Sequence, residues 1–271
     1  MIDTRRGRGY DAPMPRADSV DVLAIGAHPD DVELFAGGTL LRLAALGYTT
    51  GIVDLTRGEA ATRGTADERA AEAERAAGVL RLAHRESLDL GDARLDDSER
   101  VRSAIVEVLR RLRPRLVLTH HPDQPHPDHA AAARAVVAAA YLAGVAKFAP
   151  GADGRAAHRP SAFAHFGLPA SVAPSFVVDV SDFADARRDA IRCHRTQLHH
   201  SSGTGPQLHD SSSTAPPSAV SAEGFLERLD ARHRYYGSLV QARVGEAFFV
   251  RDTLLIDDPV RVLARPADPL P

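Results

Sequence analysis

Residues 20–33, VDVLAIGAHPDDVE, decide the fold class of this chain. The first part, residues 20–25, is short, apolar and rich in β-branched side chains, and Gly26 follows it, which predicts a buried strand. His28, Asp30 and Asp31 come directly after that strand. Ligands bind beyond the carboxyl ends of the strands in an open α/β sheet, so this segment also predicts where a functional site lies.

Predicted strands and helices alternate along the chain on the carboxyl-terminal side of this segment. Near-continuous apolar strands that alternate with helices are typical of a parallel sheet covered on both faces. We therefore predict an α/β, Rossmann-like fold with a mostly parallel sheet and helices on both faces. The other predicted strands are residues 48–55, 87–90, 115–119, 161–166 and 176–180, and the predicted helices are residues 39–46, 67–83, 98–112, 128–143, 182–197 and 225–240.

The length and composition favour one domain. The chain has 271 residues, of which 44% are hydrophobic and 25% charged, and its formal net charge is −3. We expect one domain over residues 19–262, a flexible arm at residues 1–18, and a mobile loop at residues 199–221, which are crowded with Ser, Pro, Gly and Thr. The charge gives no indication of a nucleic-acid or anionic-membrane partner.

The number of cysteines and the N-terminal segment indicate the cellular compartment in which the protein is expected. Cys193 is the only cysteine, so no intramolecular disulfide can form and a reducing compartment is expected. Residues 1–16 lack the apolar region of a signal peptide, and no apolar run reaches membrane-spanning length. We therefore expect a cytoplasmic protein with no membrane partner.

Two clusters of polar residues indicate metal chemistry. One lies within residues 26–33, and the other, HPDH at residues 126–129, follows a predicted strand and opens a predicted helix. Imidazole nitrogen and carboxylate oxygen are good ligands for a borderline divalent ion such as zinc. Two histidines and one aspartate from these two loops would leave coordination positions open, which is typical of a catalytic metal site.

Each cluster holds one residue more than the metal needs. Because His126 and His129 lie one helical turn apart, one can bind the metal while the other acts as an acid or stabilises an oxyanion. Likewise, Asp30 or Asp31 can bind the metal while the other accepts a proton from water. A structural interpretation competes, since His-Pro-Asp triplets also occur in turns, and we assign residues 121–123, the third such triplet, to a turn.

The pair of motifs AHPDDVE at residues 27–33 and HPDH at residues 126–129 resembles the LmbE/PIG-L family of zinc-dependent N-acetylglucosaminyl deacetylases. The resemblance continues in TRGE at 56–59, TRGT at 62–65 and RTQ at 195–197. The ending, RYYGS at 234–238 and GEAF at 245–248, looks like the branch that deacetylates N-acetylglucosaminyl-malate in bacillithiol biosynthesis. The match covers roughly residues 20–258.

The resemblance implies a role for each motif residue. His28, Asp31 and His129 would bind one zinc ion per chain, and Asp30 would be the general base for the attacking water. His126 would be the acid and oxyanion partner, oriented by Asp128. Arg57 and Arg63 are the residues expected to contact the substrate, an amino-sugar conjugate, and a homo-oligomer is implied by the resemblance alone.

Two other functions stay open at this point. One is a deacetylase or amidase of the same family that acts on another glycoside or thiol conjugate. The other is a non-catalytic module that binds metal or sugar, although Asp30 would be superfluous beside the metal ligand in such a module.

Two positions depart from the family pattern. Several relatives carry a basic residue before HPDH, where this chain has Gln124 and Pro125. The residue before Arg195 is often tyrosine, and here it is His194, which we interpret as a surface residue of a helix. We further expect Cys193 to be a small buried side chain and residues 199–200, two histidines, to be solvated.

Overall fold

The structure is a computed structural model, and it describes residues 19–148, 154–198, 220 and 222–256. The strands are β1 (Val22–Gly26), β2 (Thr50–Asp54), β3 (His84–Ser87), β4 (Leu116–His120), β5 (Ala162–Phe166), β6 (Phe176–Asp179) and β7 (Gly245–Phe248). The helices are α1 (Asp31–Ala45), α2 (Ala66–Leu80), α3 (Glu99–Leu112), α4 (Pro127–Ala143), the 3₁₀ turn η1 (Ser181–Phe183), α5 (Ala184–Arg192) and α6 (Phe225–Ser238).

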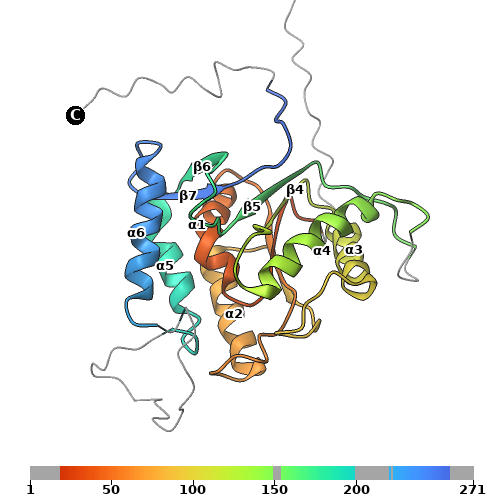
Figure 1. Cartoon of the computed structure of the whole chain (residues 1–271), viewed down its shortest axis with the longest axis horizontal. Helices are drawn as coiled ribbons and strands as arrows, with labels where there is room; N and C mark the ends of the chain where they lie inside the picture. Colours follow the sequence, from red (N-terminus) through yellow and green to blue (C-terminus); the bar gives the residue numbers. More distant parts are fainter. Residues whose placement is uncertain (1–18, 149–153, 199–219, 221, 257–271) are drawn as a thin grey trace, which may run out of the picture.

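Strands β1 to β5 form one parallel sheet in the order β3-β2-β1-β4-β5. Helices α3 and α4 cover one face of this sheet, and α1, α2 and α5 cover the other (Figure 1). The predicted Rossmann-like α/β fold is confirmed. The order reverses between β1 and β4, whose connecting helices leave to opposite faces, and ligands bind at such a point in an open sheet.

Strand β1 shows why its sequence is apolar throughout. Leu23 and Ile25 lie in the core under α3 and α4, whereas Val22 and Ala24 lie in the core under α1. All four side chains are buried. Because both faces of the strand are covered, alternation of polar and apolar residues is absent, as expected for a central parallel strand.

Helix α1 begins earlier than predicted. The prediction placed its start at residue 39, after two glycines, but the helix begins at Asp31 and contains both glycines. The Gly38 and Thr39 N–H groups donate to the buried Glu246 carboxylate at 2.8 and 2.7 Å. A Cβ on Gly38 would lie 2.8 Å from Cβ of Val180. Gly38 therefore lets helix α1 pack closely against Val180, and it does not end the helix.

Other boundaries differ from the prediction where elements are short. β3 occupies His84–Ser87, three residues before the predicted strand. The predicted helix 182–197 is a 3₁₀ turn followed by α5, which ends at Arg192. The predicted strand 176–180 is β6, which pairs antiparallel with β7 outside the main sheet. β7 was not predicted, because a strand of four residues has too few positions to show a sequence pattern of its own.

The helices with clear start signals match the prediction. Ser98 caps α3 and accepts a hydrogen bond from Val101 N at 3.4 Å. Helix α4 begins at Pro127, a favoured first position because proline lacks the N–H that a helix start leaves unpaired. The predicted turn at residues 121–123 is also present, with Asp123 N donating to His121 Nδ1 at 3.2 Å.

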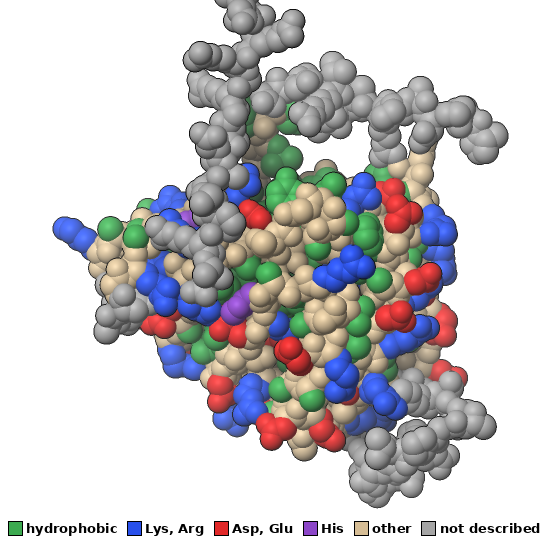
Figure 2. Space-filling view, turned by 180° about the vertical axis from the view of Figure 1, so that it is seen from behind, with side chains coloured by type: hydrophobic (Ala, Val, Ile, Leu, Met, Phe, Trp, Pro, Cys, Tyr) green, Lys and Arg blue, Asp and Glu red, His purple; other side chains and the backbone are tan. Residues whose placement is uncertain are grey.

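The surface carries both signs of charge. Figure 2 shows Lys and Arg interspersed with Asp and Glu over one face of the molecule. Among the described residues, none of the helices has the length and apolar character needed to span a bilayer. The predicted arm at residues 1–18 lies outside the described residues, and so does the predicted loop at residues 199–221 apart from Val220.

Candidate active site and metal centre

The two motif clusters meet at the reversal point of the sheet. His28 follows β1, Asp31 is the first residue of α1, and His129 lies in the first turn of α4. Asp31 Oδ1 is 3.2 Å from His129 Nε2, and Asp31 Oδ2 is 3.4 Å from His28 Nδ1. The structure thus brings together the three side chains that the resemblance implies as metal ligands.

Two groups of metal-ligating side chains stand out among the described residues. In each, the ligand atoms lie within 4.8 Å of one another: one group is His28, Asp31 and His129, and the other is His28, His126 and Asp128. The Asp128 carboxylate already accepts hydrogen bonds from Ala93 N at 2.7 Å and Leu95 N at 3.3 Å. The first group, whose carboxylate is less occupied by backbone donors, fits a cation better.

The hydrogen bonds of His28 fit a cation at its other ring nitrogen. Nε2 lies 3.1 Å from both Asp92 Oδ1 and Asp128 Oδ2. Carboxylates accept only, so Nε2 carries the proton and a neutral ring has its lone pair on Nδ1, facing Asp31. Burial lowers the pKa of His28, but hydrogen bonds to Asp128, Asp31 and Asp92 raise it to about 12. These three carboxylates thus favour a positive charge here, which is a proton on Nδ1 in the absence of metal and would be the cation when one is bound.

Asp92 was not singled out from the sequence. Its Oδ2 accepts a hydrogen bond from Ala60 N at 2.9 Å, which joins the loop after β3 to the loop after β2. It lies in a loop beyond the carboxyl end of β3, where a site residue is expected, but no motif marked it. The predicted strand 87–90 ends two residues before Asp92, so its position after a strand was the only sequence feature that pointed to it.

His120, the last residue of β4, was also missed. It is fully buried, and its Nε2 lies 3.1 Å from Asp31 Oδ2 and 3.0 Å from Ala27 N. Burial lowers its pKa to about 4, so the ring is neutral at physiological pH. Its position directly after the predicted strand 115–119 was the sequence feature that could have pointed to it.

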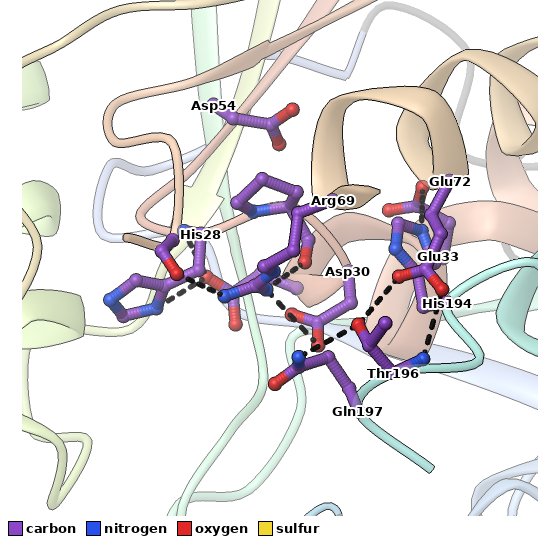
Figure 3. A network of polar contacts seen from close by, with 12 residues as sticks. His28, Asp30, Glu33, Asp54, Arg69, Glu72, His194, Thr196 and Gln197 are labelled. Atoms are coloured by element: carbon purple, nitrogen blue, oxygen red, sulfur yellow. Dashed lines mark hydrogen bonds and ion pairs between the residues drawn. The ribbon is translucent and has the colours of Figure 1, made fainter. Parts of the chain in front are cut away.

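Asp30 is buried at the start of α1 with a φ of +124°. A non-glycine residue in this region is strained, and its surroundings must hold it there. Arg69 of α2 donates to Pro29 O and Gly58 O, and its Nη2 lies 3.6 Å from Asp30 Oδ2 (Figure 3). Burial raises the pKa of Asp30 to about 6, against the opposing effect of Arg69. A carboxylate of this pKa suits a general base near neutral pH.

His126 is the N-cap of α4 and is exposed. Its Nδ1 accepts a hydrogen bond from Asp128 N at 3.3 Å, so the neutral ring carries its proton on Nε2. Burial and the nearby His129 lower its pKa. Asp128, which is expected to orient His126, contacts it through its backbone N–H, while its carboxylate contacts His28.

The loop after β2 carries the two predicted substrate residues. Thr56 Oγ1 donates to Ala27 O at 2.9 Å and so ties this loop to the loop of His28. Arg57 Nη2 lies 2.7 Å from Asp67 Oδ1, in an exposed ion pair. Arg63 is exposed, and its carbonyl accepts a hydrogen bond from Gln197 at 2.9 Å.

The interpretation of His194 as a surface residue is wrong. It is 1% exposed, and its Nε2 lies 2.8 Å from Glu33 Oε1 (Figure 3). Glu33 in turn pairs with Arg85, which also binds Asp54. Burial lowers the pKa of His194, but Glu33 raises it overall. Cys193 is only partly buried, not enclosed as expected, and residues 199–200 lie outside the described part of the chain.

Known proteins share both the sequence and the fold. Residues 23–140 match the family described as PIG-L: GlcNAc-PI de-N-acetylase. Diacetylchitobiose deacetylase of Thermococcus kodakarensis is 33% identical over 194 residues, which are 68% of this chain and 72% of that enzyme. The chain belongs to the PIG-L family. It is therefore a deacetylase, a hydrolase of amide bonds.

Two more similarities extend this result. A PIG-L relative from Rhodococcus opacus, 1D-myo-inositol 2-acetamido-2-deoxy-alpha-D-glucopyranoside deacetylase, is 31% identical over 161 residues, 47% of this chain and 55% of that enzyme. The crystal structure of a conserved protein from Thermus thermophilus superposes with a TM-score of 0.75 at 34% identity. That superposition covers 88% of this chain and 97% of the other, so the fold is shared nearly throughout.

Proposed function

We propose that this deacetylase removes the N-acetyl group of an N-acetylglucosaminyl conjugate, with one zinc ion held by His28, Asp31 and His129. The observation that carries the proposal is the convergence of these three side chains beside the buried Asp30 and the exposed His126. When bound, zinc would act as a Lewis acid that polarises the amide carbonyl. The roles of the side chains themselves follow from their own contacts.

Asp30 is the proposed general base. Its carboxylate, with a pKa raised by burial to about 6, accepts a proton from the attacking water. His126 is the proposed oxyanion partner, since its ring is exposed and, with Nδ1 accepting from Asp128 N, carries its proton on Nε2. That N–H stabilises the oxyanion, and the proton that Asp30 took from the water passes to the departing amine. Asp128 acts through His28, whose Nε2 it contacts at 3.1 Å.

The lead substrate is N-acetylglucosaminyl-malate, as the ending motifs at 234–238 and 245–248 suggest. By their names, two curated relatives act on diacetylchitobiose and on an inositol-linked N-acetylglucosamine, so these aglycones are the alternatives. Arg57 would bind the malate carboxylate. Its present partner, Asp67, is exposed. Because an exposed ion pair stabilises a protein by only ~0–1 kcal/mol, a substrate carboxylate can replace Asp67 at little cost. Arg63 is the second proposed contact to the substrate.

Acetate release from three substrates tests the proposal. We expect the zinc-reconstituted protein to deacetylate N-acetylglucosaminyl-malate with a higher kcat/KM than diacetylchitobiose or free N-acetylglucosamine. Arg57→Ala should lower kcat/KM about ten- to a hundredfold on the malate conjugate, because a charge-assisted contact is worth ~1.5–3 kcal/mol. Free N-acetylglucosamine lacks the carboxylate and should lose little.

Arg192→Ala is the matched control, since Arg192 forms a comparable exposed pair with Asp189 at 3.1 Å on α5. It should leave both rates unchanged. An absence of acetate release from all three substrates would overturn the proposed N-acetylglucosaminyl substrates. An equal effect of Arg57→Ala on both substrates would overturn the malate assignment alone.

A further inference from the structure

Gln124 joins the proposed ligand His129 to the end of strand β5. Its Oε1 lies 2.5 Å from His129 Nδ1. Its Nε2 donates to Gly167 O at 2.7 Å and to Phe166 O at 3.2 Å. The side chain is half-buried in the loop between β4 and α4. It therefore connects three segments of the chain at the proposed metal site.

These contacts determine which ring nitrogen of His129 carries the proton. Carbonyl oxygens accept hydrogen bonds only, so the group facing Gly167 O and Phe166 O must be the amide NH₂ of Gln124. The Gln124 oxygen therefore faces His129, and an amide oxygen accepts only. Nδ1 must donate to it, which leaves the lone pair of the neutral ring on Nε2. That nitrogen faces Asp31 Oδ1 at 3.2 Å.

Gly167 shows that the backbone is shaped around this amide. Its φ is +67°, and a Cβ at this position would lie 2.0 Å from Gln124 Nε2. Any larger residue would displace the Gln124 amide. The end of β5 thus holds Gln124 by two carbonyls and by the space that a glycine leaves. These contacts with the end of β5 are separate from the contact between Gln124 and His129.

We infer that Gln124 is a positioning residue that fixes the His129 tautomer with its Nε2 lone pair toward the cation. The inference rests on the zinc site of the proposed function and adds a residue that the motifs do not contain. Partners of metal-binding histidines orient the ring and set its tautomer, and their loss typically weakens metal affinity ~10–100-fold. We expect a loss of this size when the Gln124 oxygen is removed.

Two variants separate positioning from packing. Gln124→Met keeps the length of the side chain and removes both hydrogen-bonding groups. Gln124→Glu keeps an acceptor for His129 Nδ1 but points its second oxygen at two carbonyls, which is repulsive. We therefore expect Gln124→Met to lose ~10–100-fold in zinc affinity, and Gln124→Glu to keep the affinity but unfold at a lower temperature. Gln197→Met, which removes a donor to Arg63 O, is the control and should keep the affinity.

The measurements are zinc affinity by competition with a chromophoric chelator, the thermal midpoint, and the His129 tautomer by ¹⁵N NMR of the zinc-free protein. The wild type should show the Nδ1–H form, and Gln124→Met should lose it. Unchanged affinity in Gln124→Met, or affinity that follows the thermal midpoint in every variant, would overturn the inference. If the wild type bound no zinc, the proposed metal site would fail, whereas the tautomer spectra would still decide the role of Gln124.

Discussion

At the scale of single residues, Asp30 combines strain, burial and charge in one side chain. Its φ of +124° and its contact with Arg69 hold the carboxylate beside Asp31, which is the proposed metal ligand. Burial also keeps the pKa of Asp30 close to 6. The pKa values of the two neighbouring carboxylates thus move in opposite directions: burial raises that of Asp30, whereas His129 and His120 hold that of Asp31 well below its usual value against burial.

Asp30→Asn tests the proposed base. Asparagine keeps the shape and tolerates a positive φ but accepts no proton, so turnover should fall ~10²–10⁴-fold. In the wild type the base must be ionised, so kcat/KM should fall as pH drops through about 6. A bound cation favours the ionised carboxylate and shifts this limb to lower pH. The pH–rate profile of both proteins checks the prediction, and a variant that kept full turnover would exclude Asp30 as the base.

At the scale of elements, α1 is shaped by a segment more than 200 residues away in the sequence. The Glu246 carboxylate of β7 accepts from Gly38 N and Thr39 N inside the helix. This contact sets α1 against β7 and, with it, the start of α1 at the site. Buried polar groups are rarely left unpaired, and here the helix amides satisfy the carboxylate.

Two neighbouring glycines of α1 give a matched test of this packing. A Cβ on Gly38 would lie 2.8 Å from Val180 Cβ, whereas the nearest atom to a Cβ on Gly37 would be 3.6 Å away. We expect Gly38→Ala to lower the free energy of unfolding by ~1–3 kcal/mol despite the better helix propensity of alanine. Gly37→Ala should be neutral or stabilising by up to ~1 kcal/mol. Urea unfolding of both variants checks this, and equal midpoints would contradict the packing argument.

At the scale of the whole molecule, the proposed zinc ligands join both faces of the sheet. His28 and Asp31 lie at the start of α1, and His129 lies in α4, on the opposite face. A cation bound here would link the two layers. Any ligand that binds only the folded state stabilises it, by ~2.7 kcal/mol at a concentration 100 times Kd.

Zinc should therefore raise the melting temperature by ~5–10 °C at that concentration, since each kcal/mol shifts the midpoint of a protein of this size by ~2–4 °C. Asp31→Ala removes a proposed ligand and should abolish the shift. Asp30→Asn removes only the proposed base and should keep it. Thermal scans with and without a chelator distinguish the two, and loss of the shift in both variants would contradict the assignment of ligand and base.

The sequence by itself determined the strand–helix alternation, the parallel sheet and the two loops that carry the chemistry. These features are local: an apolar run around Ile25, the Ser98 cap, and Pro127 at a helix start are each visible within a few residues. The resemblance carried by the motif pair also implied the three side chains that converge at the proposed metal site. Local patterns therefore accounted for the fold class, and the resemblance for the proposed ligands.

Only the tertiary structure decided how these parts are supported. The Glu33 partner of His194 is 161 residues away, and the partner of Gly38 is 208 residues away. His120, Asp92 and Gln124 reach the site through contacts that no spacing pattern records. Hydrogen bonding and burial depend on which distant atoms the fold places within about 3 Å, and for that reason these residues, unlike the motifs, were determined by packing between elements and not by the local sequence.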